Sequence, residues 1–291
     1  MLLQDKMRHT KFSTSEQIVV DFMLDQQEHL KDYSTTMIAQ ETYTSPSILV
    51  RISKKLGFSG YSEFKKCFLE EVHYLMKDFK EIDANMPFSK DDTYLQLASK
   101  LVALKKESLD DTFSLLHYED IQKAIHLMKK ASIIKVFAIS NMTFLAEEFV
   151  FKMRHIGKET QTYSLSNMIY QEAVLSTPSD CAICISYSGE SGELLTTVNH
   201  LKHNQVPVIA ITSIGQNTLT KLADVTLYTT TREKAYSKIG GFSSITSISL
   251  LLDTLYACYF QSDYYYHYAY KLKLAQQTEQ RQIENDIVKE G

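Results

Sequence analysis

A run of hydroxyl side chains follows a short apolar segment in the middle of the chain. Residues 181–185 are Cys-Ala-Ile-Cys-Ile, and Ser186, Ser188 and Ser191 come directly after them, with Gly189 between the second and third serines. Buried parallel strands are continuous apolar runs, and the turn beyond such a strand exposes backbone N–H groups at the start of the next helix. Gly189 lets a backbone approach a ligand closely. This pattern favours a small phosphorylated ligand.

Serine- and glycine-rich turns also occur in sheets that bind nothing, so the surrounding sequence matters. The segment 186–191, Ser-Tyr-Ser-Gly-Glu-Ser, resembles the second phosphosugar-binding loop of the sugar isomerase (SIS) domain family. The resemblance extends to four further segments: 133–139, 152–158, 207–212 and 252–256. It implies that the three serines hold a phosphate, that Gly189 allows backbone approach and that Glu190 lies near the sugar hydroxyls.

A second loop is expected to meet the serine-rich loop. Ligands of doubly wound sheets bind beyond the carboxyl ends of the strands, where the strand order reverses, which favours the loop after the first strand. In relatives, by resemblance, this loop carries glycines and a serine. Here Ala138 and Ser140 stand in the glycine positions, and Met142 stands in the serine position. Asn141 and Thr143 are therefore the candidates for the missing effector contact.

The N-terminal part of the chain has the pattern of a separate helical unit. Ser13 with Glu16 forms a capping-box signature, and apolar residues at helical spacing follow it, which predicts a helix over about 15–25. Ser34 is placed to cap a short second helix. Ser45, followed by proline, opens a third helix after a tight connection.

This third helix has an apolar face and a basic face. The inward stripe consists of Leu49, Ile52, Ser53 and Leu56. Five basic residues and one acidic residue lie between Ser45 and Lys66, although the whole chain carries a net charge of −4. A capped basic helix after a short helix and a tight turn is typical of a helix-turn-helix, although an ordinary bundle could also carry it. The residues predicted to contact DNA are Ser45, Ser47, Arg51, Lys54 and Lys55.

The same segment resembles a known recognition sequence. Residues 45–65, Ser-Pro-Ser-Ile-Leu-Val-Arg-Ile-Ser-Lys-Lys-Leu-Gly-Phe-Ser-Gly-Tyr-Ser-Glu-Phe-Lys, are similar to the recognition segment of RpiR-type bacterial transcription regulators. Those regulators join an N-terminal helix-turn-helix domain to a C-terminal SIS domain. The match departs at Tyr43, where the family usually has a glycine-like turn residue and where a left-handed conformation would be strained. The resemblance implies a double-stranded DNA operator and a sugar phosphate effector as partners.

Alternating apolar runs and helical patterns predict the fold of the rest of the chain. The expected strands are 133–139, 160–163, 181–185, 208–212 and 225–228. Helices between such strands indicate a parallel sheet covered on both faces. We expect an all-α helix-turn-helix domain over 1–80, a linker over 81–92, and an α/β doubly wound SIS-type domain over 93–291. That domain should hold a five-stranded parallel sheet in an αβα sandwich and end in a helical tail.

Composition and spacing exclude several other classes. The apolar runs are well short of the about 20 residues of a membrane span, and residues 1–11 lack the apolar core of a signal peptide, so we expect a cytoplasmic protein without a membrane partner. Cys181 and Cys184 point to opposite faces of one strand, which favours packing over metal binding or redox chemistry. We expect no cofactor and no metal. A single short helix reads few bases, so we expect a homo-oligomer, a dimer or a tetramer.

Two alternatives remain beside a sugar-responsive regulator. A phosphosugar isomerase with an accessory helical domain would need an acid and a base at the site. His155, His200 and His203 lie outside the expected loops, and Glu190 is the only acid within one. We therefore predict no catalytic residue and no enzyme. The other alternative is a regulator whose effector pocket has degenerated, because the first loop has lost its glycines and its serine.

Overall fold

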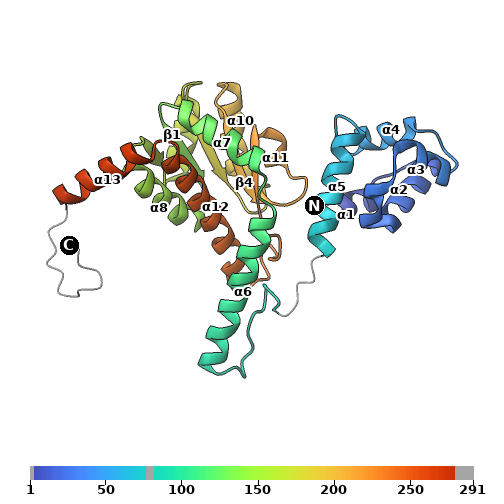
Figure 1. The fold of residues 1–291 in the computed structure, drawn as a ribbon, viewed down its shortest axis with the longest axis horizontal. Helices are drawn as coiled ribbons and strands as arrows, with labels where there is room; N and C mark the ends of the chain where they lie inside the picture. The colour runs from blue at the N-terminus through green and yellow to red at the C-terminus, as the bar shows by residue number, and fades with distance from the viewer. Residues whose placement is uncertain (1–2, 77–81, 279–291) are drawn as a thin grey trace.

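The chain forms a helical N-terminal unit and a larger α/β unit. A computed structural model covers the chain and describes residues 3–76 and 82–278 (Figure 1). The expected end of the first domain at residue 80, the start of the linker at 81 and the tail beyond 278 lie outside the described residues. At the side where the two units face each other, Lys6 Nζ donates to Gln216 Oε1 at 3.0 Å.

Six helices make up the described part of the N-terminal unit. They are α1 (Leu3–His9), α2 (Thr14–Gln26), the 3₁₀ helix η1 (Gln27–Asp32), α3 (Thr35–Glu41), α4 (Ser47–Lys55) and α5 (Tyr61–Met76). The capping box is present, since Ser13 Oγ accepts the N–H of Glu16 and Ser13 N–H donates to the Glu16 carboxylate at 2.8 Å. Ser34 Oγ accepts the N–H of Met37 at 3.2 Å, as its position before α3 predicts.

Helix α4 has the expected inward stripe but a different start. Leu49, Ile52 and Leu56 are fully buried in one cluster with the aromatic side chains of α5. The helix begins at Ser47, and the hydroxyl of Ser45 lies 2.9 Å from the Ser47 hydroxyl, so it does not cap the first turn. Ser45 still contributes its carbonyl, which accepts the N–H of residue 48 at 3.0 Å.

The turn between α3 and α4 contains a tyrosine in the left-handed region. Tyr43 has φ 52° and is 98% exposed. A β-carbon is crowded at such angles, which is why glycine is common there. The turn therefore keeps its left-handed geometry at the one position where this sequence departs from the usual glycine-like residue.

The larger unit is a five-stranded parallel sheet with the order β2-β1-β3-β4-β5. The strands are β1 (Ile134–Ala138), β2 (Thr160–Thr162), β3 (Cys181–Ile185), β4 (Val208–Ser213) and β5 (Val225–Thr229). The helices are α6 (Tyr94–Ser114), α7 (Tyr118–Lys130), α8 (Met142–Arg154), α9 (Ser166–Leu175), α10 (Gly192–His203), α11 (Thr218–Leu222), α12 (Phe242–Gln261) and α13 (Tyr264–Thr278). The predicted all-α unit followed by a doubly wound α/β unit is confirmed.

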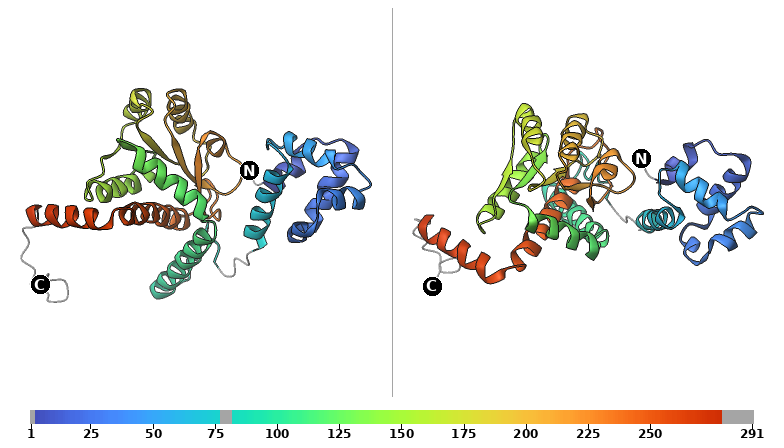
Figure 2. Two further views of the ribbon diagram at one scale, coloured as in Figure 1. Left: turned by 45° about the horizontal axis from the view of Figure 1, so that its top comes forward. Right: turned by 90° about the horizontal axis from the view of Figure 1, so that it is seen from above.

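Two hydrophobic clusters cover the faces of the sheet. Helices α7, α8 and α12 share one cluster with one set of strand side chains, and α9, α10 and α11 share the other cluster with the alternate set. Helix α12 is central to the first face, with Ile248, Leu251 and Leu255 fully buried and α6 packed against it (Figure 2).

The cysteines of β3 are structural. Cys181 belongs to one cluster and Cys184 to the other, which is the opposite-face arrangement expected for a strand. Both thiols are free, and burial raises the pKa of Cys181 to about 12 and that of Cys184 further. Among residues 3–76 and 82–278, no group of acidic, histidine and cysteine side chains has the arrangement of a metal site, and no helix is long and apolar enough to cross a membrane.

Candidate functional site

The two loops singled out by sequence lie next to each other. Strands β1 and β3 are neighbours, with β2 outside β1 and β4 outside β3. The chain adds β2 on one side of β1 and the later strands on the other side, so the strand order reverses between β1 and β3. The loop after β1 enters α8 on one face of the sheet, and the loop after β3 enters α10 on the other face. Ligands of open α/β sheets bind in the crevice at this reversal point.

Both helices that start at the reversal point have uncapped first turns in the described structure. Asn141 precedes α8 and Ser191 precedes α10, and neither side chain bonds to the first turn of its helix. In contrast, Asn217 closes the start of α11 with a complete capping box. Helix N-termini with free N–H groups attract anions. The N-termini of α8 and α10 are therefore suited to an anion, whereas the N-terminus of α11 is already capped by Asn217.

The serine hydroxyls of the loop after β3 can still donate. Ser186 Oγ accepts the N–H of Gly189 at 3.2 Å, and Ser188 Oγ accepts the N–H of Glu190 at 3.2 Å. A hydroxyl that serves as an acceptor keeps its own O–H for another partner. Ser186 is buried, Ser188 is exposed and Ser191 is intermediate, so the three hydroxyls span the depth of the loop.

Gly189 is required by its neighbours in the fold. Its φ is +67°, and a β-carbon at this position would lie 2.1 Å from Cγ of Asn217. The carbonyl of Gly189 accepts the N–H of Leu219 at 3.1 Å. The close backbone approach predicted for this glycine is therefore made to α11, in addition to any approach to a ligand.

Glu190 also has a partner within the chain. Its carboxylate accepts the backbone N–H of Thr218 and the Thr218 hydroxyl, each at 2.8 Å. These bonds tie the exposed carboxylate to the first turn of α11. The side chain holds the loop in shape, a contribution that sequence reasoning did not anticipate.

The loop after β1 is stiffer than a glycine loop. Ser140 has φ 60° and is exposed, so a serine occupies the left-handed conformation where the family has glycine. Met142 packs against the sheet cluster, and the hydroxyl of Thr143 donates to the carbonyl of Ala138 at 3.4 Å. Asn141 is exposed, and its amide makes no hydrogen bond within the described residues.

Sequence reasoning missed a buried carboxylate next to the site. The side chain of Glu233 is fully buried and accepts the N–H groups of Ser243 and Ser244 at 2.6 and 3.0 Å. It also accepts the Ser244 hydroxyl at 2.6 Å and lies 2.8 Å from Lys238 Nζ. Glu233 thereby caps α12 from ten residues upstream. It lies in an irregular segment without helical or strand periodicity, so no local pattern could have revealed this role.

The α4 surface presents two unpaired cations. Arg51 and Lys54 are exposed, and within the described residues neither forms an ion pair. Lys55 is different, because its ammonium lies 2.5 Å from Glu16. That hydrogen bond is the main reason that the pKa of Glu16 is lowered. All five residues predicted to contact DNA are exposed: Ser45, Ser47, Arg51, Lys54 and Lys55. Lys55 in addition joins α4 to α2 through its ion pair with Glu16.

Comparison with known families identifies both units. The profile of the helix-turn-helix domain of the rpiR family matches residues 1–73, and that of the SIS domain matches residues 127–258. The chain is an RpiR-family helix-turn-helix protein with a SIS domain. This RpiR-family chain is 28% identical over 259 residues to an uncharacterized HTH-type transcriptional regulator of Haemophilus influenzae, covering 88% of each chain. It is 23% identical over 255 residues to another such regulator, from Caldanaerobacter subterraneus, again covering 88% of each.

Solved structures share the fold. The Vibrio vulnificus NanR protein complexed with ManNAc-6P has a TM-score of 0.59 at 19% identity, with 94% of this chain and 97% of that chain covered. The sugar isomerase domain of an RpiR transcription factor from Sphaerobacter thermophilus has a TM-score of 0.56 at 16% identity. That match covers 62% of this chain and 99% of the other.

Proposed function

We propose that this RpiR-family protein is a DNA-binding transcriptional regulator of sugar metabolism whose operator affinity changes when a sugar phosphate binds its SIS domain. The observation that carries the proposal is the exposed face of α4, where Arg51 and Lys54 have no partner among the described residues. Unpaired cations on the exposed face of a recognition helix are suited to DNA phosphates and base edges. The proposed division is a DNA-binding domain over 1–80, a linker over 81–92 and an effector domain over 93–291.

The two loops that follow β1 and β3 form the proposed effector site. Ser186, Ser188 and Ser191 would donate hydroxyl protons to the phosphate, together with the N–H groups at the start of α10. Asn141 would contact the sugar, because its amide is exposed and has no bond within the described residues. Thr143, Gly189 and Glu190 shape the two loops. Since NanR of Vibrio vulnificus was solved with ManNAc-6P, that compound belongs in the first panel of ligands to test.

Binding without turnover is favoured over isomerase activity. Isomerisation of an aldose phosphate needs a base and an acid at the reacting carbons. His155 Nδ1 lies 2.7 Å from the carbonyl of Phe151 at the end of α8, and His200 packs edge-on against Tyr170. Glu190 is committed to α11. Turnover of a sugar phosphate that is lost in Glu190→Gln would contradict this assignment.

DNA binding is tested by charge removal from α4. Arg51→Ala should weaken binding to the natural upstream DNA by about 1–3 kcal/mol, roughly 5- to 150-fold, because a base or phosphate contact is lost. Lys123→Ala is the matched control, since it removes one exposed positive charge from α7 in the other domain. Fluorescence anisotropy titrations measure both. Equal affinities for wild type and Arg51→Ala would refute the assignment of α4.

Ligand binding is tested by thermal stability. A sugar phosphate at 100 times its dissociation constant should add about 2.7 kcal/mol to the free energy of unfolding. Ser188→Ala should reduce this gain, whereas Ser179→Ala, a hydroxyl before the start of β3 at the other end of the strand, should not. If no sugar phosphate stabilises the wild type, the regulator with a degenerate pocket becomes the better account.

A further inference from the structure

An irregular three-residue segment lies between residues 186–191, which we call the effector loop, and the proposed linker. Residues 232–234 follow β5 and precede α12. On one side they bond to Tyr187, which stands between two of the proposed phosphate-binding serines. On the other side they bond to Asn85, which lies in the described part of the proposed linker.

The bonds alternate along this segment. Tyr187 Oη donates to the carbonyl of Glu233 at 3.0 Å and accepts the N–H of Glu233 at 2.9 Å. On either side of that residue, Asn85 Nδ2 donates to the carbonyl of Arg232 at 3.3 Å, and Asn85 Oδ1 accepts the N–H of Lys234 at 2.6 Å. The linker thus holds the first and third residues of the segment, and the effector loop holds the residue between them.

Further contacts fix both ends of this arrangement. The carbonyl of Asn85 accepts the N–H of Ile239 at 2.9 Å, and the rings of Phe88 and Phe242 meet edge to face at 6.3 Å. The ammonium of Lys238 lies 4.9 Å from the centre of the Tyr187 ring. The linker and the effector loop are therefore attached to the same segment, which also caps the first turn of α12 through Glu233.

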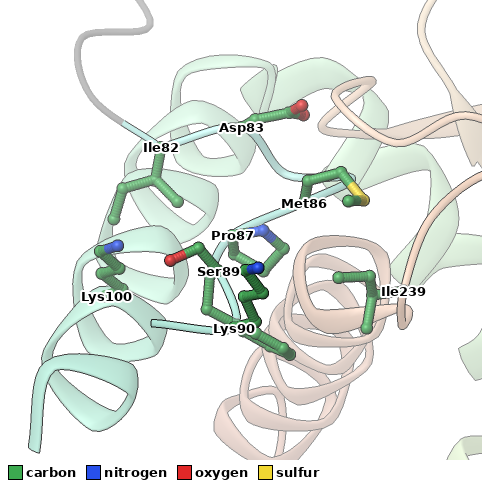
Figure 3. Close-up of a pocket in the computed structure, with 9 residues that line it drawn as sticks. Ile82, Asp83, Met86, Pro87, Ser89, Lys90, Lys100 and Ile239 are labelled. Carbon is green, nitrogen blue, oxygen red and sulfur yellow. The ribbon is translucent and has the colours of Figure 1, made fainter. Parts of the chain in front are cut away.

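The linker lies beside a surface hollow at this point. The volume of the hollow is about 630 Å³. Figure 3 shows Met86 of the linker and Ile239 on one side of it, with Lys100 of α6 on the opposite side. Within residues 82–90 the side chains of Ala84 and Pro87 are buried, and Asn85 and Phe88 contact the segment that leads into α12. Movement of residues 232–234 would be passed to the linker through the side chain of Asn85, whose two hydrogen bonds hold Arg232 and Lys234.

We infer that residues 232–234 form a clasp that couples the effector loop to the linker, with Tyr187 and Asn85 as its positioning residues. The inference rests on the proposed function, since it names the regulation of the same site. A phosphate held by Ser186 and Ser188 changes the loop at Tyr187, which lies between them. A ligand shifts a conformational equilibrium only by binding one state better than the other, and the clasp supplies two states, closed and open.

The clasp itself is tested without ligand by hydrogen exchange. Tyr187→Phe removes one hydroxyl and keeps the ring over Lys238. It should speed exchange of the amides of Lys234 and Ile239 several-fold, although neither residue touches Tyr187 in the network described above. Asp91→Ala, an exposed change on the linker side, is the control and should leave their exchange as in wild type. Unchanged exchange at both amides in Tyr187→Phe would overturn the clasp.

The coupling is tested in the full chain with the sugar phosphate that gives the largest thermal shift. Asn85→Ala should bind that compound within about twofold of wild type but lose most of the ligand-induced change in DNA affinity, which is typically 5- to 150-fold for coupled sites. If Asn85 had a purely structural role, Asn85→Ala would also change the affinity for the sugar phosphate or the DNA affinity without ligand. A full response in Asn85→Ala would overturn the coupling. A wild type that responds to no sugar phosphate would instead refute the proposed function, and the exchange experiment would still decide the clasp.

Discussion

At the scale of single residues, Gly189 has the strictest requirement in the effector loop. Its positive φ disfavours any side chain, and a β-carbon would overlap the amide of Asn217. Gly189→Ala should therefore lower the free energy of unfolding by about 1–3 kcal/mol and displace α11 from the loop. Gly192→Ala, three residues later with open space around it, should cost little. Urea unfolding followed by circular dichroism compares the two, and equal stabilities would contradict the loop geometry.

The ion pair of Glu16 and Lys55 gives the N-terminal unit a pH dependence. Bonding to Lys55 lowers the pKa of Glu16 below its ordinary 4.5, so the carboxylate stabilises the folded state above that pH. The stability difference between wild type and Glu16→Gln should be complete above about pH 4.5 and vanish as the pH falls through the lowered folded pKa. Unfolding measured across pH 2–7 tests this, with Glu41→Gln as the exposed control. A difference that grows toward acid would contradict it.

At the scale of elements, α12 depends on a carboxylate outside the helix. Glu233 is buried and accepts two N–H groups and a hydroxyl of the first turn, and it pairs with Lys238. Glu233→Ala leaves that cation and those N–H groups without their acceptor, which should cost about 3–5 kcal/mol. Glu147→Ala, an exposed carboxylate on α8, should cost much less. Chemical unfolding measures both changes, and similar losses would show that the cap of α12 adds little.

The elements also show what the sequence could predict. Strand positions were predictable because buried parallel strands leave continuous apolar runs, and β3 occupies the predicted residues 181–185. Helix α2 was predictable from a local capping box. Helix α1 was not, because its first N–H groups donate to the carboxylate of Glu71, which is far along the chain. The Glu233 cap and the Glu190 bond to α11 were hidden for the same reason, since tertiary contacts leave no periodic signal.

In the candidate site, too, local sequence patterns predict some features, and others depend on tertiary contacts. That the loops after β1 and β3 meet follows from parallel strand order, which alternating apolar runs predict. The residues holding each loop in place depend on neighbours from other elements, as with Asn217 beside Gly189. The ion pair of Lys55 and Glu16 likewise joins two residues that are far apart in the sequence, so no helical or strand spacing predicts it. The ligand and DNA contacts assigned to particular residues therefore remain predictions, which the binding experiments test.

At the scale of the whole molecule, the proposed DNA binding and the proposed effector binding have to be coupled. Two α4 helices in a dimer could contact successive half-sites about one helical turn apart, so small changes in their separation would change operator affinity. The proposed effector site lies in the sheet unit, and described linker residues bond to the segment that joins β5 to α12. Regulation of this kind requires that ligand binding favour one arrangement of the DNA-binding domains.

The most direct measurement is the affinity of the full chain for its upstream DNA with and without sugar phosphates, by fluorescence anisotropy at fixed salt. The proposal predicts that at least one sugar phosphate changes the dissociation constant for DNA by about fivefold or more, and that Ser188→Ala requires more ligand for the same change. The central claim is contradicted if DNA affinity is the same at saturating concentrations of every sugar phosphate that stabilises the protein.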